Sequence, residues 1–96
     1  MGESRVVVRR CLVSGRVQGV YYRATAAERA RAAGITGHAR NLPDGRVEVL
    51  ACGSDEVVEE FVAWLWIGPS AAKVIDVAAE TIDLAPTEWP DRFRTG

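Results

Sequence analysis

The sequence predicts an α+β fold in which two helices cover one face of an antiparallel sheet of four to five strands. Three observations indicate this class. A chain of 96 residues can bury one core but not two, so residues 1–96 are expected to form a single domain. Its composition, 48% hydrophobic and 26% charged, is typical of a soluble globular protein. Apolar residues alternate between strand spacing and helix spacing in the order βαββαβ.

The first strand is expected over residues 5–14, a Val-rich run interrupted by Arg9 and Arg10. The segment 15–20 contains two glycines four positions apart and is too short and irregular for an element, so it predicts a turn. Residues 21–33 carry six alanines at positions that suit a helix, which ends at Gly34 as a helix with a glycine cap does.

A β-hairpin is expected over residues 35–52, because two strand-like runs flank the turn sequence Leu42-Pro43-Asp44-Gly45. Ser54, followed by two acidic residues, predicts the N-cap of a second helix that ends at Gly68 and Pro69. Residues 74–80 predict a further strand, and residues 92–94 a frayed edge strand. Two helices cover only one face of such a sheet, which predicts the ferredoxin-like two-layer sandwich.

The composition excludes several classes of site. With 12 basic and 13 acidic residues the net charge is −1, so no general attraction to nucleic acid or to an anionic membrane is expected. Cys11 and Cys52 lack metal-binding spacing and His38 is the single histidine, so we expect no metal, no cofactor and no redox site. Strand parity places the two cysteines on opposite faces of the sheet, which predicts no disulfide. The N-terminal residues 1–10 lack the apolar core of a signal peptide, so a cytoplasmic protein is expected.

A glycine loop that joins a strand to the N-terminus of a helix directs backbone amides at one point, where the helix dipole also favours an anion. Gly15 and Gly19 allow the backbone to approach a ligand closely, and Arg23 lies in the first turn of the helix. A guanidinium there can bind two oxygens of a phosphate. On these residues alone, a solvated Arg23 after an ordinary glycine turn is the simpler interpretation.

The run Gly15-Arg16-Val17-Gln18-Gly19-Val20, with Arg23 three positions later, resembles the signature of the acylphosphatase family. The stretch Gly37 to Val49 is similar to the second motif of that family, and the segment from Trp64 to Ala71 is similar to the end of its second helix. The resemblance therefore covers nearly the whole chain.

The resemblance implies hydrolysis of acyl phosphates, the mixed anhydrides of a carboxylic acid and phosphate, by a metal-independent enzyme. It implies that the backbone amides of Gly15, Arg16, Val17, Gln18, Gly19 and Val20 hold the phosphate, that Arg23 binds its oxygens, and that Asn41 orients the attacking water. Inorganic phosphate or sulfate should compete for the site, and we expect a monomer with neither a nucleic-acid nor a membrane partner. A carboxylate leaves without a proton donor, since its acid has a pKa of about 4, so no general acid is required.

Three residues have simpler alternatives. Asn41 before a Leu-Pro-Asp-Gly turn could serve only to form the turn. His38 stands where the family usually has Trp, and strand parity points it away from Asn41, so a packing or surface role is expected rather than a general base. Trp64 and Trp66 point in different directions on a helix, which predicts one in the core and one on the surface.

The alternative function is a noncatalytic anion-binding or RNA-binding ferredoxin-like module. RNA readers of this fold stack bases on aromatic residues of the central strands. Residues 5–14 and 46–52 contain no aromatic residue, which disfavours that alternative.

Overall fold

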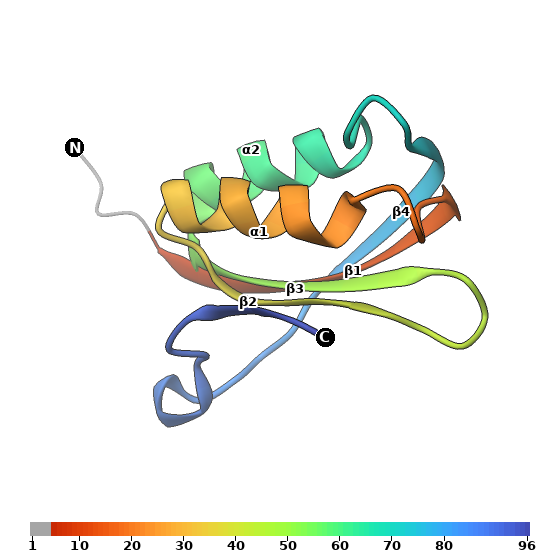
Figure 1. The fold of residues 1–96 in the computed structure, drawn as a ribbon. Coiled ribbons are helices and arrows are strands. Elements are labelled where there is room, and N and C mark those ends of the chain that lie inside the picture. Colours follow the sequence, from red (N-terminus) through yellow and green to blue (C-terminus); the bar gives the residue numbers. More distant parts are fainter. Residues whose placement is uncertain (1–4) are drawn as a thin grey trace.

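A computed structural model describes residues 5–96 of the chain (Figure 1). Residues 1–4, which begin the N-terminal stretch in which no signal peptide was expected, lie outside the described residues. Over residues 5–96 the structure has two α-helices, five strands and one short 3-10 helix. In chain order these are β1 (Val6–Arg16), α1 (Tyr22–Ala32), β2 (Thr36–Asn41), β3 (Val47–Ser54), α2 (Asp55–Leu65), β4 (Lys73–Thr81), the 3-10 helix (Pro86–Glu88) and β5 (Phe93–Thr95).

The five strands form one sheet in the order β4-β1-β3-β2-β5, and both helices lie on the same face of it (Figure 1). This confirms the predicted ferredoxin-like α+β class, and β1 lies in the interior of the sheet. The strands β1 to β4 pair antiparallel, whereas β5 pairs parallel with β2. The sheet is therefore mixed rather than wholly antiparallel. The reason is the segment 82–92, which carries the chain from one edge of the sheet to the other and reverses its direction.

The register of the strands separates the two faces as parity predicts. Cys11 pairs with Val49 and Val13 with Val47, and all four side chains are buried beneath the helices. Cys52 pairs with Val8 on the opposite face. The two thiols thus lie on opposite faces of the sheet, and both are free.

Small residues of α1 allow this helix to lie close to the sheet. Ala26, Ala27 and Ala30 are fully buried and belong to the same core cluster as the aromatic side chains of the two helices. Tyr22 is 1% exposed, and its hydroxyl donates a hydrogen bond of 2.6 Å to the carbonyl of Leu65 at the end of α2. The rings of Tyr22 and Trp64 stack with their centroids 5.9 Å apart. The two helices are therefore joined at the end of the molecule where α1 begins.

The tryptophans of the second helix divide as predicted. Trp64 is 8% exposed and packs between Tyr22 and Phe61, whereas Trp66 is 48% exposed.

None of the helices within residues 5–96 has the length and apolar character needed to cross a membrane.

Candidate active site

The strand that leads into the glycine loop ends with a β-bulge. The pairing of β1 with β4 shifts register between Ser14 and Gly15, and Gly15 adopts a φ of 120°. A Cβ atom on Gly15 would overlap the carbonyl oxygen of Lys73 on β4. Glycine is therefore required at this position both by its backbone conformation and by the neighbouring strand.

Gly15 and Arg16 are the last two residues of β1, so the loop itself is shorter than the sequence indicates and runs from Val17 to Tyr21. Val17 is 1% exposed, and Val20 packs against the core. These two valines anchor the loop to the core. The positive φ of Gly19, 74°, turns the backbone between them.

The N-terminus of α1 lacks the usual partners of a helix end. Its N-cap residue, Tyr21, lies in the left-handed region with a φ of 63°, and no side chain caps the helix. No acidic residue lies in its first turn. By contrast, α2 begins with Asp55 and Glu56, whose negative charges already lie at the positive end of that helix. Ser54 at the start of α2 makes no side-chain cap hydrogen bond either, so the two starts differ in their first-turn charges. Of the two α-helices in residues 5–96, α1 is the one whose N-terminal amides and dipole meet no acidic residue, and this combination suits an anion.

Arg23 lies in this first turn and borders a hollow of about 310 Å³. The residues that line the hollow come from the loop and from the start of α1: Val17, Gly19, Tyr21, Tyr22, Arg23 and Ala24. Within the described part of the chain, Arg23 forms no ion pair with an acidic side chain, whereas Arg9, Arg10, Arg40 and Arg46 each do. Its guanidinium is therefore available to an anion in the hollow.

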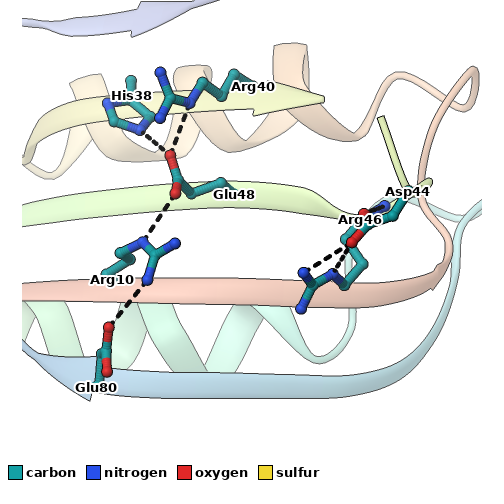
Figure 2. A network of polar contacts seen from close by, with 7 residues as sticks. All are labelled: Arg10, His38, Arg40, Asp44, Arg46, Glu48 and Glu80. Carbon is teal, nitrogen blue, oxygen red and sulfur yellow. Dashed lines mark hydrogen bonds and ion pairs between the residues drawn. The ribbon is translucent and has the colours of Figure 1, made fainter. Parts of the chain in front are cut away.

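Asn41 is the last residue of β2, where it pairs with Val47 and is exposed. The turn that follows is closed by Asp44, whose carboxylate accepts hydrogen bonds from the backbone N–H of Arg46 at 3.0 Å and from its Nε at 2.8 Å (Figure 2). Gly45 completes the turn with a φ of 95°. The turn-forming role that was the alternative for Asn41 is thus performed by Asp44.

The structure brings the loop and the hairpin to the same end of the sheet (Figure 1). The side chain of Gln18 joins them, because its Nε2 donates hydrogen bonds to the carbonyls of Leu42 at 2.9 Å and Arg46 at 3.0 Å. Gln18 was expected at the site for its backbone amide, and this role of its side chain was not predicted from the sequence. A single polar side chain within a glycine loop gives no signal of where it points.

His38 lies on the open face of the sheet, as its parity predicts, and not beside the loop. Its Nε2 donates a hydrogen bond of 2.9 Å to Glu48 (Figure 2). Glu48 also accepts hydrogen bonds from Arg10 and Arg40, which lie on the two neighbouring strands. Burial alone would raise the pKa of Glu48, but the hydrogen bonds from His38 and Arg10 and the charge of Arg40 outweigh burial and lower the pKa to about 2.

The network around Glu48 was not predicted from the sequence. The register of the strands places Arg10, His38, Arg40 and Glu48 on one face of the sheet, but the sequence alone does not give this register. Among residues 5–96, no group of three or more His, Cys, Asp or Glu side chains is placed to hold a metal ion.

Fold and site together define a small α+β protein whose strand-loop-helix junction has the amides and the arginine that suit an anion. The sequence profile of the Acylphosphatase family matches residues 9–95. An acylphosphatase of Chromohalobacter salexigens is 51% identical over 90 residues, which span 91% of this chain and 97% of that protein. An acylphosphatase of Halorhodospira halophila is 57% identical over 81 residues, or 83% of this chain and 88% of the relative.

The structure of an acylphosphatase from Coxiella burnetii superposes with a TM-score of 0.89 at 34% identity and covers 100% of both chains. The chain belongs to the acylphosphatase family. This membership confirms the resemblance found in the sequence and the predicted class of enzyme, a hydrolase of acyl phosphates. No comparison favours the noncatalytic or RNA-binding alternative.

Proposed function

We propose that this chain hydrolyses acyl phosphates to a carboxylate and inorganic phosphate at the junction of β1 and α1. The amides from Gly15 to Val20 and the start of α1 hold the phosphoryl group, and Arg23 binds two of its oxygens. Asn41 orients the water that attacks phosphorus opposite the carboxylate. The observation that carries this proposal is the uncapped N-terminus of α1 with a guanidinium in its first turn.

The chemistry of the substrate explains why so few residues suffice. The leaving group is a carboxylate that departs as a stable anion, so no side chain has to protonate it. Charge on the equatorial oxygens of the transferring phosphoryl group is balanced by Arg23 and by the amides of the loop. Asn41 is not a base and acts by holding the water in line, which lowers the entropic part of the barrier. On this mechanism the reaction proceeds without a metal ion.

Phosphate release from acetyl phosphate and benzoyl phosphate, measured in the presence of EDTA, tests the activity. We expect Arg23→Ala to lower kcat/KM by at least about 100-fold, the loss that follows removal of one preorganised charge-stabilising group. Asn41→Ala should lower kcat/KM by about 100-fold, because the attacking water is no longer held in line. Arg94→Ala is the control, because it also removes one guanidinium, here from an exposed side chain of β5. An Arg23→Ala variant as active as the parent protein would refute the assigned role.

The same geometry supports three further parts of the proposal. Inorganic phosphate and sulfate should inhibit competitively, because they present the oxygens that the loop binds. All proposed site residues belong to one chain, so the active form is proposed to be a monomer, which size-exclusion chromatography with light scattering measures. The two buried free thiols agree with the reducing conditions of the cytoplasm, the location we propose.

A further inference from the structure

We propose that Gln18 is a positioning residue whose side chain fixes the hairpin that carries Asn41 relative to the loop that holds the phosphate. The inference rests on the function proposed above for Asn41 and concerns a part of Gln18 that the phosphate does not touch. Its backbone amide belongs to the loop, whereas its carboxamide reaches the hairpin.

The two carbonyls that Gln18 binds are adjacent to Asn41 and its partner. Leu42 directly follows Asn41, and Arg46 directly precedes Val47, with which Asn41 pairs. The N–H of Leu42 also donates to the carbonyl of Arg46 at 2.8 Å, so the base of the turn is one hydrogen-bonded unit. Gln18 binds the turn on both sides, at the residues next to the ends of β2 and β3. A displacement of the Gln18 side chain would therefore also displace Asn41.

The hairpin has little other support at this point. The ladder between β1 and β3 ends at the pair Val13 and Val47, so residues 42–46 extend beyond the end of β1–β3 pairing. In the part of the chain that is described, the hydrogen bonds from Gln18 are the ones that link residues 17–21 to residues 41–46. Without them, the distance between the bound phosphate and the oriented water would depend on two independently moving loops.

Glutamine is the side chain that this arrangement requires. Its carboxamide offers two N–H donors at one nitrogen, which match two carbonyl acceptors. Glutamate has the same shape, but its carboxylate would face two carbonyl oxygens without a proton to donate. Methionine fills a similar volume and donates nothing. Both substitutions therefore remove the donors while keeping the volume of the side chain.

The side-chain carboxamides can be observed by NMR independently of activity. Gln18 is the single glutamine and Asn41 the single asparagine of the chain. A ¹⁵N-¹H spectrum of the protein will therefore contain two side-chain carboxamide pairs. We expect the carboxamide protons of Gln18 to exchange with solvent at least about tenfold more slowly than those of Asn41. The reason is that the Gln18 Nε2 group donates to two carbonyls and the Gln18 side chain is partly buried. In Gln18→Met the remaining pair, that of Asn41, should shift. Equal exchange rates, or an unmoved Asn41 signal, would overturn the proposal.

A kinetic test measures the same coupling. Gln18→Met is expected to lower kcat for acetyl phosphate by about 10- to 100-fold, because misplacement of a reacting group by about 1 Å has such an effect. The dissociation constant of inorganic phosphate should change less than threefold, since the amides and Arg23 remain. In an Asn41→Ala background, Gln18→Met should lower kcat less than threefold further. An equal loss in both backgrounds would show that Gln18 does not act through Asn41.

Gln18→Asn provides a second variant if methionine prevents folding. It keeps the carboxamide but is one methylene shorter, so it cannot reach both carbonyls and should show the same kinetic pattern. Folding of each variant is verified by circular dichroism. If the parent protein hydrolyses no acyl phosphate, the proposed function fails, whereas the carboxamide exchange test still decides whether the side chain joins the loop to the hairpin.

Discussion

Replacement of Glu48 by glutamine tests whether the open face of the sheet stabilises the fold by charge. Glu48 lies on β3 with its side chain 6% exposed. Its carboxylate accepts hydrogen bonds from Arg40 at 2.7 Å, from Arg10 at 2.8 Å and from His38 at 2.9 Å (Figure 2). In Glu48→Gln one of the two oxygens becomes an N–H₂ group that faces a cationic donor, and the negative charge that the donors share is lost.

The size of the effect follows from the pKa of Glu48, which falls from its ordinary value of 4.5 to about 2 in the folded protein. At 1.36 kcal/mol per pH unit this difference corresponds to about 3 kcal/mol. Because the folded state lowers the pKa, the stabilisation is complete above pH 4.5 and is lost as the pH falls towards 2. Breaking a buried ion pair by removal of one partner destabilises proteins by a similar amount, about 3 to 5 kcal/mol.

Urea denaturation, followed by tryptophan fluorescence at several pH values, gives the free energy of unfolding and so measures the stabilisation by Glu48. We expect Glu48→Gln to be about 3 kcal/mol less stable than the parent near pH 7, with the gap closing as the pH falls from 4.5 towards 2. Glu80→Gln is the matched control. Glu80 also binds Arg10, at 3.1 Å, but its side chain is 63% exposed, so its removal should change stability by less than about 0.5 kcal/mol. A gap between parent and Glu48→Gln that stays constant from neutral to acidic pH would refute the reasoning.

Two further pairs of substitutions compare positions that look alike in the sequence. Gly15→Ala should lower the free energy of unfolding by at least about 2 kcal/mol and weaken the binding of inorganic phosphate, because the new Cβ overlaps the carbonyl of Lys73. Gly19→Ala, with open space around it, should lower the free energy of unfolding by about 1 kcal/mol. Urea denaturation and phosphate titration measure both, and equal costs would contradict the packing argument. Trp64→Ala should cost about 3 to 5 kcal/mol through loss of its buried stacking, and Trp66→Ala less than about 1 kcal/mol. Melting temperatures compare the two, and a similar fall in both would show that the assignment of core and surface is wrong.

The elements of the fold could be predicted from the sequence because each depends on local signals. The parity of Val47, Val49 and Ala51 identifies the buried face of β3, and Gly34 marks the end of α1, where its φ is 74°. The parallel pairing of β5 could not be predicted in this way. It depends on the path of residues 82–92 across the sheet, which no local pattern encodes.

In the candidate site, too, some residues carry local sequence signals, whereas others depend on contacts between segments far apart in the sequence. Gly15, Gly19 and Arg23 carry only a weak local signal, since a glycine turn before a helix with a solvated arginine is common, and the resemblance to the family favoured the anion site. The role of the Gln18 side chain depends instead on how the loop meets the hairpin, and that contact exists only once strand order and register are fixed. Resemblance to the family supplied Asn41, but it gave no account of what holds Asn41 in place.

The two helix starts differ in the charges that lie at their positive ends. α2 begins with Ser54 and two acidic residues, so its positive end is compensated within the chain itself. α1 begins with Tyr21 in a left-handed conformation and has no cap and no acid in its first turn, although either would stabilise the helix. A capping aspartate at this position would strengthen α1 and repel a phosphate. On the proposed function, the bound phosphate takes the place of the missing cap and first-turn acid at the start of α1.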